Sequence, residues 1–171
     1  MPAHRHRGKM RHVSFDEQIN ALGLQLPGAP QLPPHVSIPF EWVRIVGNRC
    51  VVSGHGALTP EGAPMGPFGR VPTEVSLEDA QSSALSAGLS MLAAIRRAIG
   101  TLDRVSEWVI VNGFVNADAG YEQTTAVLNP VSNLLIEVFG DSGRHARTAI
   151  GVVALPLNLP VIVSAELLLD M

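Results

Sequence analysis

The chain has 171 residues, of which 46% are hydrophobic and 16% are charged, and its mean hydropathy is +0.23. These values predict one compact soluble domain, and because no run of eighteen apolar residues occurs, they exclude a membrane-spanning helix. The formal net charge is −3, but residues 1–12 hold four basic side chains and no acid. The other residues hold 8 basic and 15 acidic side chains, a net charge of −7, so nucleic acid is not expected as a partner.

The amino terminus is basic, but no apolar segment follows it, so we expect no secretory signal. Cys50 is the only cysteine, which rules out an intramolecular disulfide and is typical of a reducing compartment. The sequence therefore predicts a cytoplasmic protein. Cys50 lies within a predicted strand, and we interpret it as a small buried apolar side chain rather than a nucleophile.

Residues 1–36 are predicted to precede the domain proper. Residues 1–12 are typical of a flexible basic arm, because the spacing of their three histidines fits no closed metal site. Ser14 and Glu17 match a capping box that opens a short helix, and Gly23 would end this helix. A proline-rich connector follows, and it lies either across a neighbouring subunit or over its own domain.

Residues 37–171 are predicted to form the domain proper, which opens with two strands. Residues 42–46 and 49–53 are rich in β-branched and aromatic side chains, and the Gly47-Asn48 pair between them predicts a two-residue hairpin turn. The segment after the second strand, residues 59–70, is rich in proline and glycine and is expected to be a loop.

A long helix is predicted from Ser76 to Ile99. Ser76 with Asp79 matches a second capping box, and Gly100 fits the position just beyond the carboxyl end of a helix. A third strand is expected at residues 108–115, which are apolar on both faces apart from one asparagine.

A second long helix is predicted to begin at Asn129, with Pro130 in its first turn, and to end at Phe139. Residues 150–155 are apolar almost without interruption, as in a strand that is covered on both faces. Residues 161–169 are predicted to form the last strand.

The predicted order is β-β-α-β-α-β-β, an α/β sandwich in which two helices lie on one face of a mixed sheet. Two helices cover only one face, although several strands are apolar on both sides. Self-association would cover the second face, so we expect an oligomer.

Two arginines and a histidine, Arg144, His145 and Arg147, lie together where the fourth strand begins. Arginine presents a planar fork that binds both oxygens of a carboxylate at once, which lysine cannot do. The segment therefore suits the capture of a small carboxylate.

The run Ala146-Arg147-Thr148, an apolar strand and then Leu155-Pro156 resembles the carboxyl-terminal signature of the RidA (YjgF-like) family of enamine/imine deaminases. The resemblance covers about residues 37–169. The segment 137–147 is similar to a less characterised branch of that family rather than to its archetype. The resemblance implies a chorismate-mutase-like fold and a homotrimer with small-molecule sites between subunits.

The resemblance also implies which residues form the site. Arg147 would anchor the substrate carboxylate, and His145 and His55 are the candidate proton carriers beside it. The other substrate-binding positions that it implies are Phe40, Ser53, Gly54, Ser132 and Ala149. Phe40 stands where the family has tyrosine, Ser132 where it has asparagine, and Ile162 where it has the glutamate credited with proton handling.

Each of these residues also has a purely structural interpretation. Arg147 could pair with Asp141 or Glu137, and either histidine could be a hydrogen-bonding residue without a chemical role. A zinc site built on the two histidines would need further ligands that the sequence does not supply, so no metal and no cofactor are expected.

The resemblance thus implies hydrolysis of a small reactive enamine or imine that carries a carboxylate, as in a 2-iminobutanoate/2-iminopropanoate deaminase. The alternative is a non-catalytic trimer of the same fold that binds a small molecule or another protein, and Ile162 favours it. Ribonuclease activity or inhibition of translation is not expected from the acidic body. Substrate, protein partners and the role of the amino-terminal arm are left open.

Overall fold

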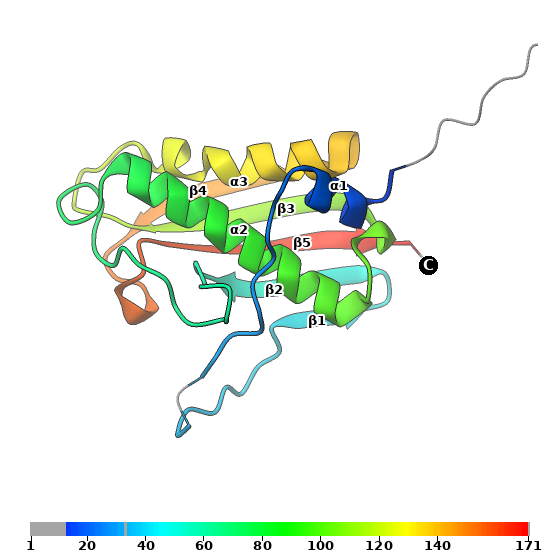
Figure 1. The fold of residues 1–171 in the computed structure, drawn as a ribbon. Coiled ribbons are helices and arrows are strands. Elements are labelled where there is room, and N and C mark those ends of the chain that lie inside the picture. Colours follow the sequence, from blue (N-terminus) through cyan, green and yellow to red (C-terminus); the bar gives the residue numbers. More distant parts are fainter. Residues whose placement is uncertain (1–12, 33, 171) are drawn as a thin grey trace, which may run out of the picture.

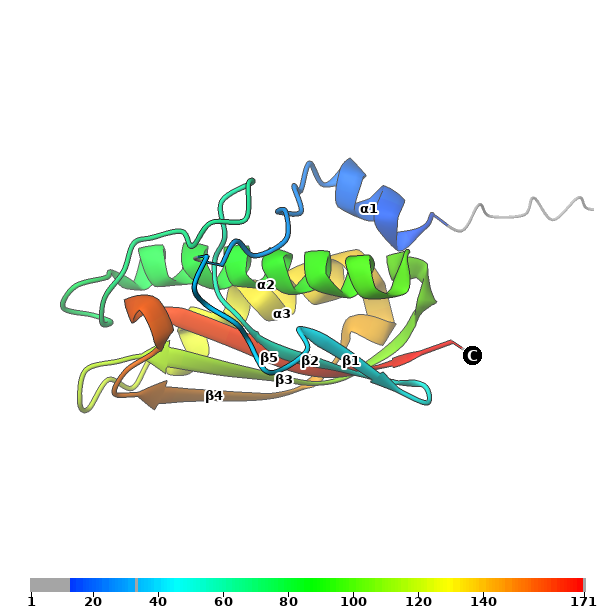
Figure 2. The ribbon, with the colours of Figure 1, turned by 90° about the horizontal axis from the view of Figure 1, so that it is seen from below.

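A computed structural model describes residues 13–32 and 34–170 (Figure 1). Five strands form one mixed sheet in the order β1-β2-β5-β3-β4, and the helices lie on one face of it (Figure 2). The predicted order of elements and the fold class are therefore confirmed. The element bounds are α1 Phe15–Ala21, β1 Val43–Val46, β2 Arg49–His55, α2 Leu77–Ile99, β3 Val105–Asn116, α3 Thr124–Phe139, β4 Ala146–Val152 and β5 Val161–Leu169.

The predicted hairpin joins β1 to β2. Val46 pairs with Arg49, so Gly47 and Asn48 form a two-residue turn, and Gly47 has a φ of 61° that suits glycine. Next in the sheet, β5 pairs antiparallel with both β2 and β3, and β3 pairs parallel with β4. The last strand of the chain therefore lies at the centre of the sheet.

Helix α2 has the bounds that the sequence predicts. The Ser76 hydroxyl oxygen accepts from the Asp79 backbone N–H at 3.0 Å, and Gly100 ends the helix with a φ of 88°. Only half of the predicted capping box forms, because the Asp79 carboxylate accepts from the Ser76 hydroxyl at 2.9 Å instead of returning to the Ser76 backbone.

Helix α3 begins at Thr124, so the predicted start at Asn129 is wrong. Pro130 lies inside the helix and lacks the N–H that would bond to the carbonyl of Ala126, four residues earlier. The side-chain amide of Gln81 on α2 donates to that carbonyl at 3.0 Å. Because a neighbouring helix replaces the lost hydrogen bond, α3 continues through the proline to Phe139.

Strand β4 is not covered on both faces, as the sequence predicted, but forms an edge of the sheet. It pairs with β3 alone, and Ile150 is 45% exposed. Beyond the strand, Val153 is 81% exposed. Among the described residues no helix covers these two apolar side chains, so the apolar pattern does not reflect burial within a single chain.

Helices α2 and α3 lie side by side over one face of the sheet (Figures 1 and 2), and their buried side chains form one core with those of the strands. Gly88 lets α2 approach Leu134 and Val131 of α3, and Gly113 on β3 leaves room for Leu128. A Cβ at Gly113 would overlap Leu128, and one at Gly88 would press on the end of Leu134, so both glycines allow α3 to pack closely above the sheet and α2.

The segment before the sheet packs over its own domain. The predicted capping box of α1 is present, and Asp16 in its first turn forms an ion pair with Arg96 of α2 at 3.0 Å. The connector donates hydrogen bonds from Gly28 to Pro60 and from Gln31 to Gly62, each at 2.9 Å. The predicted flexible arm, residues 1–12, lies outside the described residues. Within the part of the chain that is described, no helix is long and apolar enough to cross a membrane.

Candidate functional site

Strand β4 and helix α3 bring Arg147 and Ser132 into contact. Arg147 donates from Nη1 to Ser132 Oγ at 3.0 Å and from Nη2 to Asn129 Oδ1 at 3.1 Å. Nη2 also donates to the backbone carbonyl of Thr125 at 3.3 Å. Thr125, Asn129 and Ser132 are four and three residues apart, so they form one stripe along α3 that receives the guanidinium.

All three acceptors of Arg147 are neutral. Neither predicted acidic partner binds it: Asp141 pairs with Arg144 at 3.2 Å, and Arg147 forms no ion pair with Glu137 or any other acid among residues 13–32 and 34–170. Three of the five N–H groups of Arg147 are used, and its full positive charge is not neutralised by a carboxylate. The structure thus holds this cation in place without compensating its charge.

His145 lies beside this pair and has an orienting partner on each ring nitrogen. Nδ1 is 2.8 Å from the backbone carbonyl of Gly143, which can only accept, so Nδ1 carries the proton. Nε2 then bears a lone pair and accepts from the hydroxyl of Ser132 at 3.1 Å. The hydrogen bonds therefore run in one direction, from Arg147 through Ser132 and His145 to Gly143.

Burial lowers the pKa of His145 below its ordinary value of 6.5, and the charge of Arg147 lowers it further, against the opposing effect of the Gly143 carbonyl. The imidazole is therefore neutral near pH 7. A neutral imidazole can act as a general base, so His145 can accept a proton at Nε2 from the Ser132 hydroxyl that is bonded to it.

A shallow hollow of about 370 Å³ lies over these groups. Two arginines, a histidine, an asparagine and a serine supply its polar groups, and one isoleucine supplies an apolar wall. Its lining residues are Asn129, Ser132, Ile136, Arg144, His145 and Arg147. The predicted group of two arginines and a histidine therefore does surround one space, and no acidic residue lines it.

The remaining predicted site residues gather elsewhere, at the carboxyl end of β2. Phe40, Gly54 and His55 line a largely apolar pocket of about 680 Å³, together with Ile162 of β5. The hydroxyl of Ser53 donates to the Glu41 carbonyl at 2.7 Å and is not among the lining residues. Ile162 thus places an apolar side chain in this pocket, where the family's pattern has a glutamate.

We predicted from the sequence that these residues form one site, but within a single chain they lie in two separate places. Strands β5 and β3 lie between β2 and β4 in the sheet, so the two groups are about 14 Å apart, three spacings of about 4.8 Å. Ala149 belongs to the β4 group, and its carbonyl oxygen accepts from the Thr124 hydroxyl at 3.1 Å. Within one chain the predicted residues therefore fall into two groups, which we name the β4 half-site (at β4 and α3) and the β2 half-site (at the end of β2).

His55 is a buried residue of the β2 half-site, with only 2% of its surface exposed. Nδ1 is 2.7 Å from the Ser53 carbonyl, and the Trp42 ring packs beside it at 5.2 Å. Nε2 is buried without a partner among the described residues. Burial lowers the pKa of His55 below 6.5, with a smaller contribution in the same direction from the charge of Arg97.

We expect His55 to make the folded chain less stable in acid. Between its lowered folded pKa and the unfolded value near 6.5, the unfolded chain binds more protons, so stability is complete above pH 6.5 and falls as the pH decreases through this window. Urea unfolding of wild type and His55→Asn at several pH values measures how the free energy of unfolding depends on pH. The variant should show a weaker loss of unfolding free energy in acid, and parallel losses in the two proteins would contradict the assignment.

Two other predicted features can be placed. Cys50 is buried in β2, and burial raises the pKa of its thiol to about 11, so the interpretation as a packing residue is confirmed. No group of three histidine, cysteine or acidic side chains in the described part of the chain could hold a metal ion.

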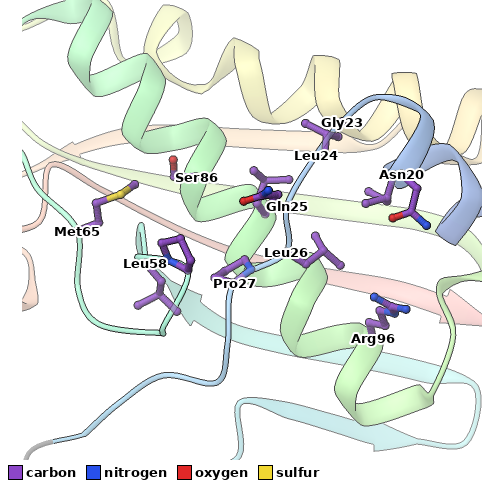
Figure 3. Close-up of a pocket in the computed structure, with 13 residues that line it drawn as sticks. Asn20, Gly23, Leu24, Gln25, Leu26, Pro27, Leu58, Met65, Ser86 and Arg96 are labelled. Atoms are coloured by element: carbon purple, nitrogen blue, oxygen red, sulfur yellow. The ribbon is translucent and has the colours of Figure 1, made fainter.

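A third pocket, of about 700 Å³, lies between the amino-terminal segment and α2 (Figure 3). Leu24 and Leu26 of the connector, Ser86 and Arg96 of α2, and Met65 of the long loop surround it (Figure 3). None of the predicted site residues lines this pocket.

Asn129 and Thr125 were not identified as site residues from the sequence. Asn129 was interpreted as a helix cap because proline follows it. The available signal was the spacing of the polar residues at 125, 129 and 132, since these positions share one side of the helix.

Comparison with known proteins shows clear relatives, although no protein-family profile matches the chain. Protein TCP17 from Trypanosoma cruzi is 36% identical over 150 residues, which are 86% of this chain and 89% of that protein. The crystal structure of Atu1372, a protein of unknown function from Agrobacterium tumefaciens, aligns with a TM-score of 0.81 and 30% identity over 91% of this chain and 92% of that one. RidA from an Antarctic Psychrobacter species aligns with a TM-score of 0.53 and 24% identity over 82% of this chain and 94% of that one, which shows a shared fold.

Proposed function

The chain belongs to the Rid/YjgF family, and from this premise we propose that it hydrolyses a small reactive enamine or imine that carries a carboxylate. The observation that supports the proposal most is the uncompensated cation of Arg147, held by three neutral acceptors next to a neutral histidine. A substrate carboxylate would supply the missing negative charge and leave the reactive carbon beside the histidine.

The proposed reaction needs only water and protein groups. Water adds to the imine carbon as its proton passes to Ser132 Oγ and the Ser132 proton passes to His145 Nε2; the proton is then returned to the imine nitrogen by the same route. The carbinolamine hydroxyl then gives its proton to the nitrogen through the same groups as the carbon–nitrogen bond breaks, which gives ammonia and a 2-oxo acid. Histidine would thereby perform the proton transfer for which the family uses a glutamate, since Ile162 cannot.

We also propose that the complete site lies between subunits of a cytoplasmic homotrimer. The two half-sites are separated within one chain, and each lies near a part of the sheet that the helices do not cover. Contact between the β4 half-site of one subunit and the β2 half-site of another would bring Arg147 and Phe40 to one cleft. Residues 37–171 would form the trimer domain, and residues 1–36 would be the arm, short helix and connector that precede it in the chain.

The alternative is a trimer that binds a small carboxylate without turning it over. One observation favours it: the pocket that contains Ile162 is largely apolar, and it offers no carboxylic acid to a bound imine. This alternative keeps Arg147 as the anchor and gives His145 only a hydrogen-bonding role.

Release of ammonia from freshly generated 2-aminoacrylate tests the proposal. His145→Gln should lower the rate about 10²-fold or more, because glutamine can accept from Ser132 but cannot carry a proton at neutral pH. His35→Gln is the matched control, since His35 is exposed in the connector. Ammonia release at the wild-type rate in His145→Gln would reject the role of the histidine. No release from wild type would reject the deaminase and support the binding protein.

A further inference from the structure

Ser132 is polarised from both sides. Its only hydroxyl hydrogen is donated to His145 Nε2, and its oxygen accepts from the cationic Nη1 of Arg147. Both contacts favour the alkoxide: the histidine accepts the proton, and the guanidinium stabilises the negative charge that would remain. A serine whose only role was to hold the arginine in place would not need a base on its proton.

The histidine has the orientation that a base beside a nucleophile requires. Gly143 fixes the tautomer by accepting from Nδ1, so the lone pair of Nε2 points to the serine. This arrangement reproduces the roles of nucleophile, base and orienting acceptor that define serine hydrolases, with a backbone carbonyl in place of the acid. The groups come from α3, β4 and the turn between them, so packing holds them together.

Donors for a developing oxyanion are also present. Two N–H groups of Arg147 are not used by the hydrogen bonds described above, and Asn129 accepts with its oxygen, which leaves its amide nitrogen free to donate. These donors line the same hollow as the serine. A carbonyl oxygen that gained negative charge there would be stabilised.

We propose that Ser132 is a nucleophile and that the hollow between α3 and β4 hydrolyses small activated acyl compounds through an acyl-serine. The hollow of about 370 Å³ has room for a small acyl compound, and the charge of Arg147, with that of Arg144 beside it, favours a compound that carries negative charge. The class is therefore acyl phosphates and related small anionic acyl compounds. This activity goes beyond the proposed function and does not need an imine.

The reaction proceeds in two balanced steps. Ser132 Oγ bonds to the carbonyl carbon as its proton passes to His145 Nε2. The bond to the leaving group then breaks, and that group takes the proton. In the second step water bonds to the acyl carbon, its proton passes to His145, and Ser132 Oγ leaves with that proton as the carboxylic acid is released.

The test is to incubate the full chain with acetyl phosphate or with p-nitrophenyl acetate, to quench in acid, and to locate the acetyl group by mass spectrometry. The chain contains one lysine, Lys9, and its only thiol is buried, so little background acylation competes. We expect acetyl-Ser132 from both compounds. Acetyl groups only on Lys9, on the amino terminus or on His145, or no acetylation at all, would overturn the proposal.

Ser132→Ala and His145→Gln should each lower release of p-nitrophenolate about 10²-fold or more, whereas Ser142→Ala should not change it. Ser142 is the matched control because its hydroxyl donates to the Phe139 carbonyl and lies outside the hollow. Equal rates in Ser132→Ala and wild type would overturn the proposal, and mass spectrometry of the wild type tests it without any variant.

Arg144→Gln should lower the reaction with acetyl phosphate more than that with p-nitrophenyl acetate, because only acetyl phosphate carries a negative charge when it binds, whereas p-nitrophenyl acetate is a neutral ester. An equal effect on both would overturn the assigned preference. The two activities fail separately: ammonia release without acetyl-Ser132 would remove this inference and leave the deaminase. Acetyl-Ser132 without ammonia release would support this inference and reject the deaminase.

Discussion

Arg147→Ala is expected to weaken binding of a small 2-oxo acid such as pyruvate about 10²-fold or more. The variant loses two charge-assisted hydrogen bonds from the guanidinium to the carboxylate, each worth roughly 1.5–3 kcal/mol. The charge of Arg147 is available for these bonds because no acid of the described chain neutralises it. Arg147→Lys should bind with intermediate strength, since it keeps the charge but loses the planar fork. Isothermal titration calorimetry measures all three affinities.

Two controls make this result specific to the site. Arg44→Ala removes an exposed arginine from β1, at the opposite edge of the sheet, and should leave the affinity unchanged. The oligomeric state of Arg147→Ala, measured by light scattering, should match that of wild type, because the guanidinium bonds only to α3 of its own chain. Unchanged pyruvate binding in Arg147→Ala would show that the anchor lies elsewhere.

Gly143→Ala should destabilise the fold by about 1–3 kcal/mol or more. A Cβ at this position would overlap the backbone carbonyl of Leu135 and press on the backbone nitrogen of Ile136. Backbone atoms within α3 cannot move aside without breaking helical hydrogen bonds, so the turn and the helix must separate. The same shift would move the Gly143 carbonyl away from His145 and disturb the orientation of the imidazole.

Urea unfolding of Gly143→Ala and Gly151→Ala compares the loss of unfolding free energy at the two positions. In Gly151→Ala the new Cβ would meet only side-chain atoms, of Ala117 at 3.3 Å and of Thr124 at 3.6 Å, so a much smaller loss is expected. Similar unfolding free energies for the two variants would mean that the chain relaxes around residue 143. The tight contact between the turn and α3 would then not set the geometry of the histidine.

The relatives place these features in context. The alignment with Atu1372 has a TM-score of 0.81, and the alignment with Psychrobacter RidA has one of 0.53, so the chain shares the fold of RidA but is more similar in structure to a protein of unknown function. The proposed roles of His145 and Ser132 are not carried by either alignment, and the alignment with RidA shows the fold alone. The experiments with His145 and Ser132 address these roles directly.

Local patterns in the sequence were enough to predict most elements. The Ser14 and Ser76 caps, the Gly47-Asn48 turn and the stop at Gly100 depend on hydrogen bonds and dihedral angles within a few residues. The spacing of apolar residues identified the strands and the order β-β-α-β-α-β-β, because this spacing also depends only on residues that are close in the sequence. The approach of two arginines and a histidine to one space was also predictable, because they are neighbours in the chain.

Tertiary contacts decided the extent of α3, the position of β4 in the sheet and the distances between the candidate site residues. Helix α3 passes through Pro130 because Gln81 of another helix satisfies the carbonyl that the proline leaves free. A strand has the same pattern of apolar residues whether its second face is covered by its own chain or left open, so the edge position of β4 was not predictable. The bond between Ser132 and His145 depends on how a helix lies over a strand, and the separation of the half-sites depends on β5 and β3 lying between them. Such distances are set by packing between segments far apart in the chain, which local patterns do not encode.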